Sequence, residues 1–455
     1  MKISIDYLLR GTASTIAADG VTQALRLVTN VALARLLNPE LFGIMLIVNS
    51  LRTGIELISD VGIGQNIIYH KNGNEPNFYN TAWTLQVIRG IAIWLLALAA
   101  TVPISKFYQS PIIVYIVPFT AFNMVLVGFT SISPFLLRKR LQITKLNAFE
   151  VVASCISSAV FVLLAYLHPN IWSLVFGGLF ATVITMAGSY FLLPDVKPRF
   201  HLSKRFAWEI LHFGKWIYLS TMVYFLATNF DRLYLAKVIP LELLGVYGIA
   251  RAISDLAGMA VMRLGNYVVF PFIATHAQMT RSELCEQLAP PRVRLLGIAA
   301  LCFAFSIASI DLVIKLLYDQ RYHAASWMLP VLLVGSWFAV LANLNEATLL
   351  GLGKPLYSAV GNGVKFAFLL IGLPLSVRSY GVLGGIFIVI LAEFSRYIPL
   401  FVGQRREQFS FGRQDALVTL GGFAMLGLLE WLRWMFGFGT SFESLPIAGH
   451  QFGHN

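Results

Sequence analysis

The stretch RLLNPELFGIMLIVNSLRTGIELISDVGIGQNIIY, from Arg35 to Tyr69, occurs in this chain a second time in altered form. The second copy, LAKVIPLELLGVYGIARAISDLAGMAVMRLGNYVVF, runs from Leu235 to Phe270. Each copy begins with a short turn that contains a proline and a glycine, and then continues as a long apolar segment. A repeat shifted by about 200 residues predicts two structural halves, as in many secondary transporters.

Each copy also carries an arginine four residues before an acid. The pairs are Arg52 with Glu56 and Arg251 with Asp255. Side chains with this spacing lie on the same face of a helix. Charged residues in the middle of apolar segments are functional-site hypotheses, because facing lipid would cost them several kcal/mol each.

The bulk composition indicates a membrane protein. Of its 455 residues, 57% are hydrophobic and only 12% are charged, and the mean hydropathy is +0.72. Soluble domains carry about 25% charged residues, so this chain could not cover a water-facing surface. The net charge of +12 is concentrated in a few hydrophilic connections, which is the positive-inside pattern and excludes a nucleic-acid partner.

Apolar segments of about 20 residues or more predict the transmembrane helices. Twelve of them cover residues 13–36, 41–69, 79–104, 111–137, 146–167, 171–193, 213–239, 245–272, 294–317, 327–350, 356–376 and 381–402. A thirteenth, 416–437, follows a basic connection. With the N-terminus in the cytoplasm, all the basic connections fall on the cytoplasmic side, which predicts a multi-pass membrane protein of this orientation.

The predicted fold is an all-α integral membrane protein with two six-helix bundles around a central cavity, 12 core transmembrane helices and a probable 13th. Six spans separate the two copies of the repeat, so both halves enter the membrane in the same direction and the bundles are parallel. We expect bundles at 1–193 and 213–403. A cytoplasmic linker with an amphipathic helix covers 194–212, and residues 404–455 hold a basic connection, the extra apolar helix and a polar tail.

The second span carries a polar stripe of Asn49, Arg52, Glu56 and Asp60 at spacings of three and four residues. Each charge costs roughly 2.5–3.5 kcal/mol at the centre of a lipid-facing helix, so the three charges together would cost about 8–10 kcal/mol. We therefore expect this stripe to face the bundle interior or a wet cavity.

Three further cations, Arg26, Arg89 and Lys365, lie near the middle of other spans without an acid partner on the same helix. Cations outnumber acids at this depth, which predicts an electropositive cavity suited to a phosphate or pyrophosphate group. A structural alternative stays open for Arg52–Glu56 and Arg251–Asp255, in which each pair is neutralised within its own helix and aids insertion or packing.

Sequence motifs for catalysis are missing. The nearest Gly-Lys to a phosphate-binding loop is Gly353-Lys354, which Pro355 follows, and the eight histidines form no ligand cluster. We therefore predict no enzyme activity and no cofactor or metal. The energy would come from an ion gradient, the membrane potential or consumption of the cargo downstream. In the first case Glu56, Asp60 or Asp255 would bind a coupling proton or sodium ion.

The repeated stretch also resembles a known family. The run ARLLNPELFGI (Ala34–Ile44), the segment NFDRLYLAKVIPLELLGVYGIARAISDLAGMAVMRLGNYVVFPFIA (Asn229–Ala274) and LLGLGKPLYS (Leu349–Ser358) are similar to polysaccharide repeat-unit flippases. These are the O-antigen and exopolysaccharide branch of the multidrug/oligosaccharidyl-lipid/polysaccharide exporter superfamily. The resemblance implies two six-helix bundles around a cavity whose cations correspond to Arg26, Arg52, Arg89, Arg251 and Lys365.

The resemblance further implies the function. The cargo would be an undecaprenyl-pyrophosphate-linked oligosaccharide, moved from the cytoplasmic to the periplasmic face by alternating access. Membrane lipid, a polysaccharide polymerase and chain-length machinery would be the partners of a monomeric transporter. The alternatives are a cation-coupled multidrug or small-solute exporter of the same superfamily and, from another class, a membrane glycosyltransferase, polymerase or ligase.

Overall fold

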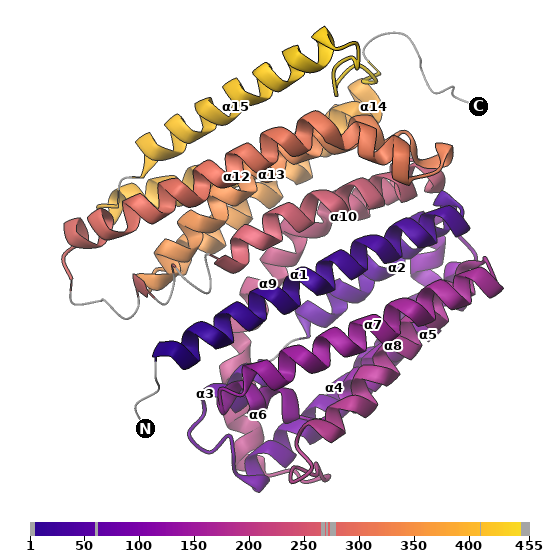
Figure 1. Ribbon diagram of the computed structural model, residues 1–455. Helices are drawn as coiled ribbons and strands as arrows, with labels where there is room; N and C mark the ends of the chain where they lie inside the picture. Colours follow the sequence, from indigo (N-terminus) through magenta and orange to yellow (C-terminus); the bar gives the residue numbers. More distant parts are fainter. Residues whose placement is uncertain are drawn as a thin grey trace. The chain divides into compact units, whose positions relative to one another are not determined.

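The computed structural model describes residues 5–59, 62–264, 269, 272–273, 279–409 and 411–446. Every regular element in these ranges is a helix (Figure 1), so the predicted all-α class is confirmed. The chain divides into two compact units. The first is Met1–Phe225 with Ala236–Leu241, and the second is Leu226–Leu235 with Glu242–Asn455.

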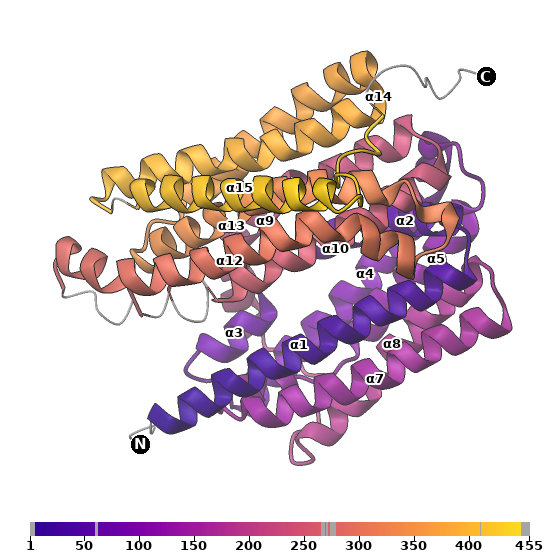
Figure 2. The same cartoon turned by 45° about the horizontal axis from the view of Figure 1, so that its top comes forward.

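The first unit begins with eight helices. They are α1 (Ile5–Leu36), α2 (Pro39–Ile58), α3 (Ile63–Tyr69), α4 (Pro76–Tyr108), α5 (Ile113–Gly128), α6 (Ser133–Lys139), α7 (Ile143–Leu167) and α8 (Ile171–Leu192). Pro39 and Pro76 stand in the first turns of α2 and α4, where a missing N–H costs nothing and the fixed φ suits a helix. In this unit α1 packs along α7, and α7 packs along α8 (Figure 2).

Two segments that the sequence predicts as single spans are broken in the structure. The predicted span 41–69 is interrupted between α2 and α3, where Gly62 adopts a left-handed conformation with φ 66°. The predicted span 111–137 bends by 50° between α5 and α6. The two short helices after the breaks, α3 and α6, pack against each other, so the breaks lie in one region of the first unit.

After a turn at residues 194–195, residues 196–203 form a strap over α4 that has no regular secondary structure. The backbone N–H groups of Arg199, His201 and Ser203 donate to Asn80 Oδ1, Thr84 Oγ1 and Thr81 Oγ1 at 3.0–3.1 Å. The donors alternate along the strap, as they do in an extended chain. The strap is therefore fastened to one polar face of α4.

α9 (Lys204–Val238) follows the strap directly, so the amphipathic stretch 201–216 mostly forms the beginning of this helix. Ile210 is fully buried in a core cluster of the first unit that also contains Phe78, and Phe206 packs against that cluster. Trp208 on the opposite side is exposed. The first turns of α9 thus have one side buried in the first unit and one exposed side.

The second unit contains the remaining helices. They are part of α9, α10 (Leu241–Leu264), α12 (Arg281–Leu317), the short 3-10 helix η2 (Gln320–Tyr322), α13 (Ala325–Gly351), α14 (Leu356–Arg406) and α15 (Gly412–Met435). A capping box of Thr280 and Glu283 begins α12. α13 is the most buried of the candidate spans and packs against both α12 and α14.

α14 consists of two helical limbs joined at Gly381. This residue has φ 60° and ψ −151°, a combination that is essentially restricted to glycine. The limbs correspond to the predicted spans 356–376 and 381–402, which therefore follow each other with only this short joint between them.

The predicted thirteenth segment forms α15, which runs along α12 (Figure 1). The Arg433 guanidinium lies 2.7 Å from Asp311 on α12, and Trp337 Nε1 donates to Thr419 Oγ1 at 3.0 Å. Large apolar side chains such as Leu420, Trp431 and Trp434 are exposed on this helix. In length and composition α15 can cross a membrane.

Seven helices in the described ranges are long and apolar enough to span a membrane, or eight if the bent pair α5–α6 is one span. This supports a multi-pass membrane protein, while the count of 12 core helices remains a prediction. In this count of candidate spans α14 is one helix, although it consists of two limbs. The helices α1, α2, α9 and α10 are not among these seven, and they carry many of the polar and charged side chains considered next.

Candidate functional site

A polar cavity of about 510 Å³ lies among α1, α2, α5, α7 and α8 of the first unit. We call it the arginine cavity, because Arg26 and Arg52 are the charged residues among its described lining. The rest of the wall is rich in hydroxyl and amide groups: Thr22, Thr29, Asn30, Asn49, Thr120, Asn123, Ser154, Ser157, Ser158 and Thr182. None of the described lining residues is acidic.

The two guanidinium groups of this cavity have no ion pair within the described ranges. Arg52 Nε is buried and lacks a hydrogen-bond acceptor, and Asn123 Oδ1 in the same wall also lacks a partner. A buried guanidinium nitrogen without an acceptor is costly, because it has lost its contact with water and gained no hydrogen bond. The arginine cavity is therefore chemically suited to an anion that carries several acceptor oxygens.

A second cavity of about 800 Å³ in the first unit has a different lining. We call it the mixed cavity, because it contains Glu56, Arg89 and Glu150 together with the aromatic rings of Phe135 and Phe149. Thr182 lines both cavities, so the two adjoin.

Arg89 of the mixed cavity is engaged by the end of α2. One of its terminal nitrogens donates to the backbone carbonyl of Glu56 at 2.7 Å and to Ser59 Oγ at 3.1 Å, and Nε donates to Ser59 Oγ at 3.2 Å. A cation beside unpaired carbonyls at a helix C-terminus is favourable. Arg89 thus caps the C-terminal end of α2, where the helix is interrupted before α3.

The polar stripe expected on the second span is found on one side of α2. Asn49 and Arg52 line the arginine cavity, and Glu56, one turn further, lines the mixed cavity. Arg52 and Glu56 form no ion pair with each other within the described residues. Asp60 lies outside the residues that the structure describes.

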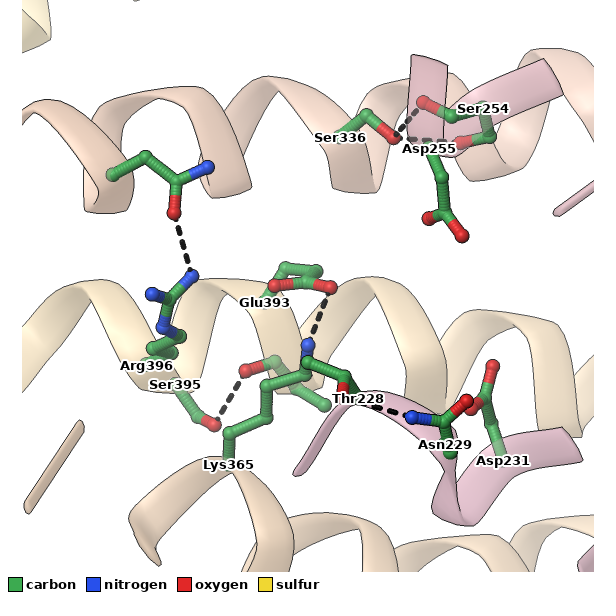
Figure 3. A network of polar contacts seen from close by, with 12 residues as sticks. Thr228, Asn229, Asp231, Ser254, Asp255, Ser336, Lys365, Glu393, Ser395 and Arg396 are labelled. Atoms are coloured by element: carbon green, nitrogen blue, oxygen red, sulfur yellow. Dashed lines mark hydrogen bonds and ion pairs between the residues drawn. The ribbon is translucent and has the colours of Figure 1, made fainter. Parts of the chain in front are cut away.

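Arg251 and Lys365 belong to a different environment, a buried charge network in the second unit. Figure 3 shows Lys365 with Glu393 and the nearby Asp231, Asp255 and Arg396. Arg251 lies 3.6 Å from Asp231, 3.3 Å from Asp255 and 3.4 Å from Glu393. Lys365 donates to Glu393 at 2.6 Å. Both cations are more than nine-tenths buried.

Further contacts complete this network. Arg232 pairs with Asp255, Arg396 pairs with Glu346, and Tyr247 donates to Asp231. The participating cations are Arg232, Arg251, Lys365 and Arg396, and the acids are Asp231, Asp255, Glu346 and Glu393. The formal charges of these groups cancel, so the network is neutral as a whole and its geometry favours a packing role.

The five cations that the sequence singles out thus lie in three different local environments. Arg26 and Arg52 share the arginine cavity, Arg89 lines the mixed cavity, and Arg251 and Lys365 share the network of the second unit. The sequence analysis did not identify Ser154, Ser157 and Ser158 as residues of a cavity wall. Their spacing of three and four residues within an apolar span could have indicated it, because this spacing places the three hydroxyls on one face of α7.

Comparisons with known proteins identify the family and the fold of this chain. Residues 32–326 match the family model described as polysaccharide biosynthesis protein. Teichuronic acid biosynthesis protein TuaB of Bacillus subtilis (strain 168) is 21% identical over 305 residues, which are 66% of this chain and 62% of that relative. Amylovoran biosynthesis protein AmsL of Erwinia amylovora is 25% identical over 284 residues, 62% of this chain and 72% of that protein. The chain therefore spans less than two thirds of the length of TuaB.

Among solved structures, lipid II flippase MurJ in an inward closed conformation has a TM-score of 0.74 at 12% identity, over 94% of this chain and 93% of that one. Transporters of the MOP superfamily are also among the structures with the same fold. At this identity the likeness concerns the fold alone, and it confirms the predicted all-α transporter fold. The family model covers more than half of the sequence, and the chain belongs to the polysaccharide biosynthesis protein family.

Proposed function

We propose that this protein is a flippase that carries a lipid-linked saccharide across the membrane and holds the phosphate part of its cargo in the arginine cavity. The observation that supports the proposal most directly is the pair Arg26 and Arg52, two guanidinium groups without ion pairs within the described residues of a cavity whose described lining has no acid. The family and its relatives, named for polysaccharide biosynthesis, support the same proposal.

The chemistry of the wall suits a phosphate or pyrophosphate. Each guanidinium can donate two parallel hydrogen bonds to phosphate oxygens, and hydroxyl and amide groups such as Asn49 and Ser158 can donate more. Charge-assisted hydrogen bonds contribute about 1.5–3 kcal/mol each. A cationic drug would meet two uncompensated positive charges here, which argues against the alternative of a multidrug exporter.

The finer assignment is that the cargo is an undecaprenyl-pyrophosphate-linked oligosaccharide repeat unit. It would move from the cytoplasmic to the periplasmic face of the inner membrane by alternating access, with the N-terminus in the cytoplasm. The basic connections on one predicted side support this orientation. A polysaccharide polymerase and chain-length machinery are the partners we expect for a monomeric transporter.

A coupling proton or sodium ion is part of the same proposal, with Glu56, Asp60 and Asp255 as its candidate ligands. Arg232 and Arg251 already hold Asp255. The Glu56 carboxylate has no ion pair within the described residues and lines a cavity. Of the two described candidates, Glu56 is therefore the more available.

The test uses Arg26→Gln and Arg52→Gln, each reconstituted in vesicles with a fluorescent polyprenyl pyrophosphate as the probe. We expect each substitution to lower the translocation rate by about tenfold to a hundredfold, because one charged contact is lost. Lys145→Gln, an exposed cation at the start of α7, is the matched control. Normal translocation by both arginine variants would overturn the proposal.

A further inference from the structure

We infer that the mixed cavity is a saccharide subsite, which binds the neutral sugar next to the phosphate while the arginine cavity holds the phosphate itself. This inference rests on the proposed function and adds to it the chemical class of the neighbouring ligand group. It follows from the position, lining and charge of the mixed cavity.

The two cavities are placed for one ligand that has two parts. Thr182 lines both, and the consecutive residues Arg52 and Thr53 of α2 line the arginine cavity and the mixed cavity respectively. Arg52 and Glu56 are one helical turn apart, a rise of about 6 Å. A phosphate held by Arg52 would therefore have its attached sugar within reach of Glu56.

The polar groups of the mixed cavity suit sugar hydroxyls. The Glu56 carboxylate has no ion pair within the described ranges, and Gln65 is exposed in the wall. Gln86 Nε2 donates to the backbone carbonyls of Val127, Gly128 and Thr130, which fixes the amide and leaves its Oε1 as an acceptor. A carboxylate and amides together can accept from and donate to neighbouring hydroxyls.

The same cavity also presents apolar surface. Phe135 packs so closely on Gly64 that a Cβ atom at Gly64 would lie 2.5 Å from its ring, and Phe149 packs in the same way on Gly188. Both rings are among the lining residues and give the mixed cavity an apolar wall. A pocket with such a wall and a few convergent polar groups is typical of sites for small polar ligands with an apolar face.

The charge of the mixed cavity decides the class of sugar. Glu56 and Glu150 are acidic, Arg89 is engaged by the end of α2, and Glu150 lies 3.5 Å from Arg138. A uronic acid beside Glu56 would bring two like charges together, which is unfavourable. The volume of about 800 Å³ is within the range of ligand pockets, about 300–1,000 Å³. We therefore assign a neutral saccharide.

The test compares three kinds of isoprenyl pyrophosphate probe on the purified full chain in nanodiscs. The first kind is the isoprenyl pyrophosphate without a sugar, called the bare probe. The second kind carries one neutral sugar, either a hexose or an N-acetylhexosamine, and the third carries one hexuronate. We expect at least one neutral sugar probe to bind about tenfold more tightly than the bare probe, and the hexuronate to gain nothing.

Three substitutions locate this gain. Glu56→Gln should reduce the gain from the sugar by about tenfold and leave binding of the bare probe intact, whereas Arg52→Gln should weaken all probes equally. Phe149→Leu should reduce the gain without affecting the bare probe. Glu40→Gln, an exposed acid in the first turn of the same helix, is the control for charge.

The outcomes separate this inference from the proposed function. If wild-type protein binds none of the probes, the proposed function itself fails. If it binds the bare and all sugar-bearing probes equally, only the saccharide subsite is overturned. A hexuronate preference would overturn the neutral assignment. If Glu56→Gln changes only the pH or sodium dependence of transport and keeps the sugar gain, Glu56 serves ion coupling and the subsite assignment is wrong.

Discussion

The Arg251 guanidinium lies 3.3 Å from the Asp255 carboxylate one turn away on α10, whereas the corresponding pair of the first repeat, Arg52 and Glu56, forms no ion pair within the described residues. The two copies of one sequence pattern thus have different environments. In the second unit the arginine is enclosed by acids, and in the first it faces a cavity without them. Only the first copy leaves its arginine available to a ligand.

Lys365→Met tests the packing role of the buried network. We expect a loss of about 3 kcal/mol in the free energy of unfolding, because Glu393 keeps its charge but loses its nearest partner. Chemical denaturation in detergent measures this change. The double variant Lys365→Met with Glu393→Gln should lose less than the sum of the two single variants.

A matched control for this experiment is Lys354→Met. Its pair with Glu407, at 3.2 Å, is half exposed, so we expect less than about 1 kcal/mol. Equal effects of Lys354→Met and Lys365→Met would contradict the burial argument.

Arg433→Met should loosen α15 from α12. Asp311 is almost fully buried and would remain there without its cation, which costs about 3–5 kcal/mol. We expect faster proteolysis in the connection between α14 and α15, measured by limited digestion. The control is Arg321→Met, at an exposed ion pair with Asp319, which should leave the digestion rate unchanged. Equal digestion rates of the Arg433→Met and Arg321→Met variants would argue against a role of Arg433 in holding α15 on α12.

Arg89→Leu should destabilise the end of α2. The variant leaves the Glu56 carbonyl and the Ser59 hydroxyl without their donor, at a cost of about 1–3 kcal/mol. Hydrogen exchange of the last turn of α2 should accelerate accordingly. Arg138→Leu, on the exposed side of α6, serves as the control. An unchanged rate of hydrogen exchange in the last turn of α2 would mean that Arg89 does not stabilise the C-terminal end of this helix.

Gly90→Ala tests the close approach of α4 and α5. A Cβ at Gly90 would lie 2.4 Å from the backbone oxygen of Met124, which cannot move without shifting α5. We expect a loss of about 1–3 kcal/mol in unfolding free energy. Gly297→Ala in α12 has open space around it and should instead stabilise by about 0.5–1 kcal/mol. The opposite order of the two variants would contradict this packing.

Much of the fold can be predicted from periodicity, and much of the side-chain pairing cannot. The polar stripe of α2 follows from residue spacing, because spacing fixes the helix face. By contrast, Lys365 finds its acid at Glu393 on the other limb of α14, and Asp311 pairs with Arg433 rather than with Lys315 on its own helix. Such partners depend on how helices are rotated against each other, which residue spacing within one helix does not specify.

The strap over α4 has a consequence for protein engineering. Arg199, His201 and Ser203 bond in alternation to Asn80, Thr84 and Thr81, so an insertion or deletion of one residue among them would point the wrong N–H groups at α4. Chimaeras that exchange the C-terminal half between family members should therefore be joined beyond Ser203 and also beyond Ile210, because the first turns of α9 pack in the core of the first unit. A junction before Arg199 would separate the strap from the helix whose side chains it matches.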